Sequence, residues 1–232
     1  MFKKVLAIGA LALFTLTATV FSAGTEAANP TAGIPAVPAI SVAAGDDISD
    51  EEAEGLQFMR EEEKLAHDVY VTMYKKWDLP IFNNIAAAEQ KHADAVVTLL
   101  DRYDLADPAD GKAFGEFTNP DLQALYDQLI KQGNKSAADA LKVGLAIEEI
   151  DILDLEERLA AMDNADIETV YKNLLAGSEN HLRAFARNLK TRTGETYVPQ
   201  YMSQKAYDTV VNVVSGRGGG NGGWGGRGGG RW

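Results

Sequence analysis

The chain has 232 residues, 46% of them hydrophobic, and its 34 acidic side chains outnumber the 22 basic ones to give a formal net charge of -12. This acidic balance disfavours nucleic acids and anionic surfaces as partners, and it attracts cations. Because the chain contains no cysteine, the sequence excludes disulfides, thiolate metal sites and a rubredoxin-type iron centre.

Residues 1–23 are typical of an export signal, because two lysines precede an apolar run that ends at Phe21 and small residues follow it. The run is short and rich in threonine, which favours cleavage over a stable membrane span. Residues 24–48 are rich in Ala, Pro and Gly and predict a flexible spacer, after which Ser49 and Glu52 fit a capping box that opens a helix. We therefore expect an exported protein that is periplasmic, secreted or held at the cell surface, and the lack of cysteine excludes a lipoprotein.

The first two predicted helices each carry apolar residues at steps of three and four, which indicates one inward face per helix. Polar residues interrupt both stripes: Glu63 in the first, and Glu89 with His92 in the second. An ionised carboxylate in a core costs several kcal/mol, roughly, unless a counter-charge or a metal compensates it. If the helices form a hairpin that turns near Leu79, Glu63 and His92 lie within roughly 4 to 5 Å of the same level, so the three side chains can converge.

A second predicted hairpin repeats this pattern after a long connection, residues 104–134, which includes a short helical stretch. Its two helices place Glu148 and His181 at inner positions, nearly equidistant from a turn near Asn164. Two of the three histidines of the chain therefore occupy equivalent places in the two hairpins. Glu149 competes with Glu148 for the inner position, because its neighbours in the helix are also apolar.

The order of these residues resembles that of the ferritin-like di-iron carboxylate bundles. The segment EKLAHDVY, residues 63–70, resembles the first-helix motif of rubrerythrins, and FNNIAAAEQKH, residues 82–92, resembles their second helix. Together with AIEEIDILDL and GSENHLRAF, these segments are more similar still to the family called domain of unknown function 2202, over about residues 50–212. The resemblance implies an all-α, ferritin-like four-helix bundle of two antiparallel hairpins joined by a long crossover, over residues 49–214, with flexible extensions at both ends.

The resemblance also implies a metal site. The second Glu-x-x-His of the di-iron proteins is replaced here by Ser178-x-x-His181, and Asp151 can supply the missing oxygen. Ser178 and Tyr70 are expected beside the ligands. Tyr70 is interpreted as a packed core aromatic, with the alternative that its hydroxyl donates a hydrogen bond to a ligand carboxylate. Mixed carboxylate and imidazole ligands suit iron, as a di-iron pair, or manganese, with zinc as the common competitor. The predicted ligands are Glu63, Glu89, His92, Glu148 and His181, with Asp151 as auxiliary.

A metal-free alternative stays open, in which Glu63 pairs with a basic residue and the histidines are ordinary core residues. Few Lys or Arg residues fall on the inner stripes, which favours metal. Glu61 and Glu62 are expected on a solvated face, and His67 at the edge of the stripe is expected to play a surface or supporting role.

Residues 215–232 consist of glycine with three arginines and two tryptophans, plus one serine and one asparagine, and such a tail cannot bury a core. It favours contact with anionic envelope polymers, or self-association, over nucleic-acid binding. Two functions follow. The first is an exported metal protein for oxygen or peroxide chemistry or iron handling, with an external electron donor. The alternative is a metal-free or structurally metallated envelope-binding module, and the sequence leaves homo-oligomerisation open.

Overall fold

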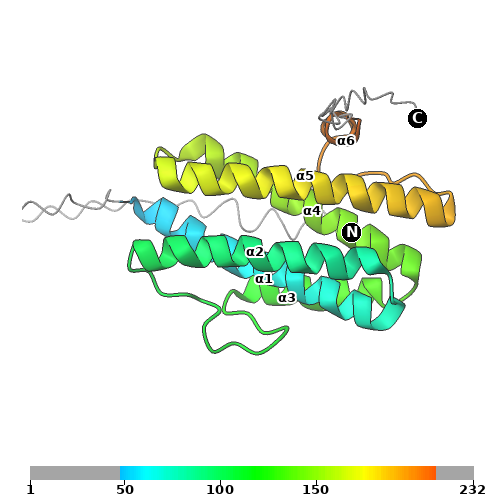
Figure 1. Ribbon diagram of the computed structural model, residues 1–232, viewed down its shortest axis with the longest axis horizontal. Helices are drawn as coiled ribbons and strands as arrows, with labels where there is room; N and C mark the ends of the chain where they lie inside the picture. Colours follow the sequence, from blue (N-terminus) through cyan, green and yellow to red (C-terminus); the bar gives the residue numbers. More distant parts are fainter. Residues whose placement is uncertain (1–47, 213–232) are drawn as a thin grey trace, which may run out of the picture.

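The structure is a computed structural model that describes residues 48–212, and within this range the chain forms helices and no strand (Figure 1). This confirms the all-α prediction. The expected export signal, nearly all of the spacer and the glycine-rich tail lie outside the described residues. The helices are α1 (Asp50–Trp77), α2 (Pro80–Arg102), α3 (Pro120–Gly133), α4 (Ala137–Ala161), α5 (Ala165–Thr193) and α6 (Gln204–Val211).

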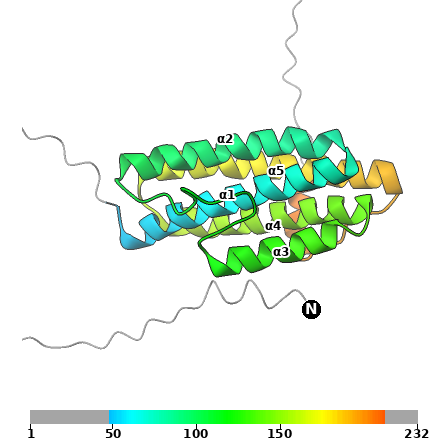
Figure 2. The same ribbon diagram turned by 90° about the horizontal axis from the view of Figure 1, so that it is seen from below.

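The four long helices form two antiparallel hairpins that pack against each other. In the first, α1 opens with the predicted capping box of Ser49 and Glu52. Its C-cap residue is Asp78, whose φ of 51° is left-handed, and α2 begins at Pro80. In the second, the side chain of Asn164 caps α5 by accepting hydrogen bonds from two backbone N–H groups. The hairpins meet where α1 contacts α4 and α2 contacts α5 (Figure 2).

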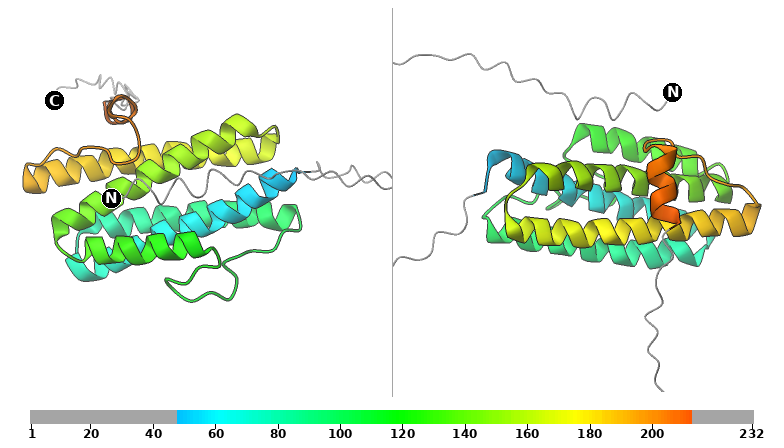
Figure 3. Two further views of the ribbon diagram at one scale, coloured as in Figure 1. Left: turned by 180° about the vertical axis from the view of Figure 1, so that it is seen from behind. Right: turned by 90° about the horizontal axis from the view of Figure 1, so that it is seen from above.

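The long connection between the hairpins carries α3, which packs against α1 and α4 on the outside of the four long helices. The sequence predicted a helical stretch here. After α5 the chain turns at Gly194, where φ is 76°, and α6 then lies across α5 (Figure 3). Among residues 48–212, none of the helices combines the length and the apolar composition that a membrane span requires.

The core is divided into two apolar clusters by a polar layer. One cluster includes a tilted aromatic trio of Tyr70, Phe82 and Phe185, whose ring centroids are 5.2 to 6.2 Å apart. The other includes Leu56 near the N-terminus of α1 and Tyr171 near the N-terminus of α5. Each long helix crosses from one cluster to the other, and the acidic and histidine residues lie at the crossing. This layer is the candidate site.

Candidate metal centre

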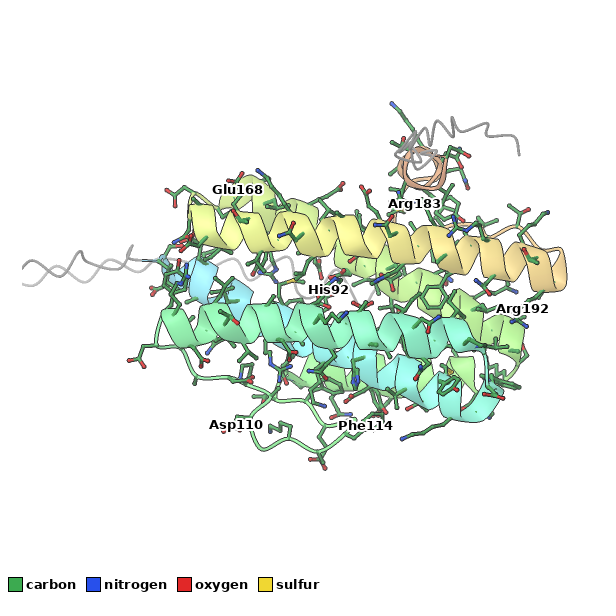
Figure 4. All side chains as sticks on the ribbon, viewed as in Figure 1. His92, Asp110, Phe114, Glu168, Arg183 and Arg192 are labelled. Atoms are coloured by element: carbon green, nitrogen blue, oxygen red, sulfur yellow. The ribbon has the colours of Figure 1, made fainter. Side chains whose placement is uncertain are left out.

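All four long helices contribute to a group that we call the Glu–His cluster: Glu63 from α1, Glu89 and His92 from α2, Glu148 from α4 and His181 from α5. The Glu63 and Glu89 residues are 2% exposed and Glu148 is 1% exposed, whereas the two histidines are partly buried. His92 is labelled in Figure 4, where it lies between the ribbons of α2 and α5. The structure therefore brings together the five residues that the sequence singled out as principal ligands.

Glu89 lies at the centre of the Glu–His cluster and contacts both histidines with different oxygens. Its Oε2 is 2.8 Å from Nδ1 of His92, and its Oε1 is 2.9 Å from Nδ1 of His181. Glu63 Oε2 lies 3.4 Å from the first nitrogen and Glu148 Oε2 lies 3.6 Å from the second. The two imidazole rings stack with centroids 5.6 Å apart. The result is two triads that share one carboxylate.

The possible ligand atoms of the Glu–His cluster lie close enough together to hold metal ions. In each triad, Glu63–Glu89–His92 and Glu89–Glu148–His181, the donor atoms all lie within 4.8 Å of one another. The Nδ1 atoms of both histidines are buried and, although carboxylate oxygens are close, neither forms a hydrogen bond of acceptable geometry; Oε1 of Glu63 is also buried without a partner. Orphaned buried donors and acceptors are costly. Because iron and manganese accept carboxylate and imidazole ligands together, the chemistry of the cluster suits them.

Burial and mutual contact shift the protonation of the cluster. Burial, with the negative charges of Glu89 and Glu148, raises the pKa of Glu63 to about 7. Burial and the charge of Glu89 raise the pKa of Glu148 to about 8. Burial opposes the charge of Glu89 too, but its contacts with His181 and His92 lower its pKa to about 2.

The pKa values of both histidines are raised. Burial disfavours their charged form, yet Glu63 and Glu89 raise the pKa of His92 to about 10. Glu148 and Glu89 likewise raise the pKa of His181 to about 11. Without metal, the raised pKa values therefore keep protons on both imidazoles, next to the ionised carboxylate of Glu89. Because metal ligation requires neutral imidazole, loading must displace these protons.

Tyr70 and Ser178, both expected beside the ligands, each donate a hydrogen bond to an acidic residue. The Tyr70 hydroxyl donates a hydrogen bond of 2.5 Å to Oε1 of Glu148. The Ser178 hydroxyl donates to Oδ2 of Asp151. Asp151 belongs to neither compact triad, and its other oxygen is buried without a hydrogen-bond partner. It therefore lies beside the cluster, held by the serine that replaces the expected glutamate.

The sequence missed Gly177, which makes room for the His92 ring. A Cβ atom at this position would lie only 2.6 Å from both Cε1 and Nε2 of His92. A glycine inside a helix costs about 1 kcal/mol relative to alanine, so a glycine in the middle of α5 was a readable signal of close packing.

Two expectations about neighbouring acidic residues were wrong. Glu61 and Glu62 are 3% and 4% exposed rather than solvated. Glu61 is buried because the connection before α3 folds over this part of α1. Glu61 accepts hydrogen bonds from the backbone N–H groups of Thr118 and Asn119. Glu62 has no hydrogen-bond partner for either carboxylate oxygen.

The choice between Glu148 and Glu149 is settled by the segment after α5. Glu149 is fully buried but faces away from the cluster, where its carboxylate accepts hydrogen bonds from the backbone N–H groups of Gln200, Tyr201 and Met202. Its role is to hold this segment in place.

The metal-free alternative predicted a basic partner for Glu63. Among the described residues the cation in contact with Glu63 is His92, and the Lys and Arg ion pairs involve other acidic residues. The third histidine, His67, contacts Asp68 through Nδ1 at 2.9 Å and lies outside the cluster.

Comparisons with known proteins place the chain in a family without assigning it a function. A family model described as an uncharacterized protein domain (DUF2202) matches residues 52–214. The uncharacterized protein MJ0754 of Methanocaldococcus jannaschii is 52% identical over 171 residues, which cover 74% of this chain and 92% of the relative. The crystal structure of hypothetical protein MJ0754 from Methanococcus jannaschii DSM 2661 matches this structure with a TM-score of 0.69 and 49% identity, over 78% of this chain and 97% of that one. Neither description states an activity, so the function has to be argued from the cluster.

Proposed function

The chain belongs to the DUF2202 family, and from the geometry of its Glu–His cluster we propose that it is a ferritin-like protein that binds two metal ions, iron or manganese. The observation that carries this proposal is the position of Glu89. Its two oxygens each approach a different histidine, at 2.8 and 2.9 Å. A carboxylate shared in this way by two triads is suited to bridging two ions.

The remaining ligands divide evenly about Glu89. Glu63 and His92 would hold one ion, and Glu148 and His181 would hold the other. Five side chains would not fill the coordination of two ions, and an unfilled position is the condition for a substrate molecule to bind. Bound iron or manganese would supply redox chemistry on oxygen or peroxide, and an electron donor from outside the chain would complete the cycle.

The residues around the cluster are arranged to hold ligands and protons. Tyr70 fixes the orientation of Glu148 by donating a hydrogen bond to it, and such contacts to ligands tune metal affinity. Apolar clusters lie on both sides of the Glu–His cluster. His92 and His181 hold protons that must leave when metal binds. The export expected from residues 1–23 belongs to the same proposal, which places this chemistry outside the cytoplasm.

Elemental mass spectrometry on the full chain, purified without a histidine tag and loaded with Fe²⁺ or Mn²⁺, tests the proposal. We expect two bound ions that are missing from a Glu89→Ala, His92→Ala variant whose circular dichroism matches the wild type. Equal metal content in the two proteins would overturn the proposal and leave the envelope-binding alternative.

A further inference from the structure

A cavity of about 640 Å³ lies where α6 crosses α5, and residues of both helices and of the segment between them line it. Its volume is within the range of roughly 300 to 1,000 Å³ that is usual for small-molecule sites. Figure 3 shows α6 across α5, and Figure 4 labels Arg183, one of the lining residues. None of the five residues of the Glu–His cluster lines this cavity, so it is a separate feature of the fold.

Two buried polar groups hold the walls of this cavity in place. Arg183 is 9% exposed, and its Nη1 donates a hydrogen bond of 3.0 Å to the carbonyl oxygen of Val210, which joins α6 to α5. The buried carboxylate of Glu149 accepts hydrogen bonds from the backbone of residues 200–202, shortly after Tyr197, which lines the cavity. The cavity is therefore formed without a ligand, as most small-molecule sites are.

One face of α5 supplies positive charge to the cavity. Arg183, Arg187 and Lys190 follow one another at steps of four and three, which places them on one face of a helix, and all three line the cavity. Arg187 and Lys190 form no ion pair among the described residues. Lys190 Nζ instead donates to the uncharged oxygens of Gly194 and Thr196, at 2.9 and 3.1 Å. Two exposed cations of this face thus lack a carboxylate partner.

The acidic side chains near the cavity do not balance this charge. Glu195 lies 2.6 Å from Nζ of Lys142, and Glu179 lies 3.4 Å from Nη1 of Arg183. Asp208 is the other acidic residue of the lining. Two cations without a carboxylate partner therefore face one carboxylate, and positive charge is in excess. Such an excess attracts anions, and it stands out in a chain of net charge -12.

Two tyrosines give the cavity an apolar wall beside its cationic face. Tyr197 and Tyr207 both line it, and their rings are tilted with centroids 5.8 Å apart. Aromatic side chains of this kind bind the apolar part of a ligand. Arginine and lysine are the side chains that recognise phosphate. A phosphate monoester carries a charge of about −1.5 to −2 at pH 7, which two cations can balance.

We propose that this cavity binds an organic phosphate. The phosphate group contacts Arg187 and Lys190, and the apolar part of the ligand packs against Tyr197 and Tyr207. The proposal does not depend on metal binding at the Glu–His cluster, because the two sites share no residue.

Isothermal titration calorimetry of the full-length protein with phenyl phosphate tests the site. The protein is treated with a chelator, so that the phosphate cannot bind through a metal ion. The test variant is Arg187→Gln, Lys190→Gln, and the matched control is Lys172→Gln, Arg192→Gln, which removes two exposed cations of the same helix that do not line the cavity. Both variants change the net charge equally, and every protein compared retains the three arginines of residues 215–232.

We expect the wild type and the control to bind one phenyl phosphate per chain. The test variant should lose affinity by about tenfold or more, equivalent to about 1.4 kcal/mol. Asp208→Asn should bind more tightly because it removes the opposing carboxylate, and misfolding cannot produce such a gain. Inorganic phosphate should bind more weakly because it lacks the ring. Absence of saturable binding to the wild type, or equal losses in the test variant and the control, would overturn the proposal, and equal affinity for inorganic phosphate would overturn the assignment of an organic ligand.

Discussion

Replacing Gly177 with alanine tests whether close packing of α5 holds the His92 ring in place. The added Cβ would lie 2.6 Å from two ring atoms, whereas ordinary contact begins at 3.4 Å. The ring or the helix must therefore move by roughly 0.8 Å, which exceeds the ±0.2 Å tolerance of a metal–ligand distance. Nδ1 of His92 faces Glu63 and Glu89, so this movement changes the position of a ligand atom.

Gly177→Ala should change the stability of the metal-free protein only slightly and should weaken metal binding strongly. Alanine favours a helix over glycine by about 1 kcal/mol, and overpacking a core costs about 1 to 3 kcal/mol. We therefore expect the metal-free Gly177→Ala variant to be less stable than the wild type by about 0 to 2 kcal/mol. Loss of one well-placed ligand should lower Mn²⁺ or Fe²⁺ affinity by about 10- to 100-fold, the range seen when groups that support metal ligands are altered.

Isothermal titration calorimetry with Mn²⁺ and chemical denaturation without metal measure the two quantities. Gly133→Ala is a matched control, because its Cβ would lie 2.6 Å from the flexible sulfur of Met73 and not from a predicted ligand. Wild-type Mn²⁺ affinity in Gly177→Ala would refute the inference that this glycine positions His92.

Three further outcomes are expected. Glu148→Gln should lose metal and keep the stability of the metal-free protein, because burial raises the pKa of Glu148 to about 8. Glu149→Gln should keep metal, and its free energy of unfolding should fall by about 1 to 3 kcal/mol. Metal analysis and chemical denaturation of both variants test this pair, and metal loss in Glu149→Gln with destabilisation in Glu148→Gln would contradict it. The pKa values of Glu63 and Glu148 are raised, so both groups contribute stability that is fully present below their ordinary pKa and is lost as pH rises. The melting temperature of the chelator-treated protein should therefore decrease as pH is raised from about 5 to about 8. An increase over this range would contradict the prediction. Burial opposes the charge of Asp68, but hydrogen bonds from His67, a lysine and a backbone N–H lower its pKa. The stability that Asp68 contributes is therefore lost as pH falls through that pKa. Denaturation curves should show less acid destabilisation in Asp68→Asn than in the wild type.

The helical periodicity predicted the residues whose inward position follows from the spacing along their own helix. Glu63, Glu89 and His92 lie at the expected level because the rise of two antiparallel helices determines which residues meet. The same reasoning placed Glu148 and His181 in the second hairpin, and the structure brings all five together. Local spacing was sufficient here because each residue interrupts a regular apolar stripe.

Contacts between distant segments were not readable from periodicity. Glu61 points away from the inner stripe of α1, but the connection before α3 covers it with two backbone N–H donors. Glu148 and Glu149 both have apolar neighbours. Only the position of residues 200–202 shows that Glu149 is the one that accepts hydrogen bonds from backbone N–H groups. A helical pattern gives the direction of a side chain relative to its own helix and does not identify the segment that covers it.

Anomalous X-ray scattering from crystals of the manganese-loaded full chain tests the central claim most directly, because it locates each ion relative to Glu89. The account predicts two peaks on opposite sides of the Glu89 carboxylate, one near Glu63 and His92 and the other near Glu148 and His181. A single peak that Glu89 does not bridge, or no peak at the Glu–His cluster after loading, would contradict it.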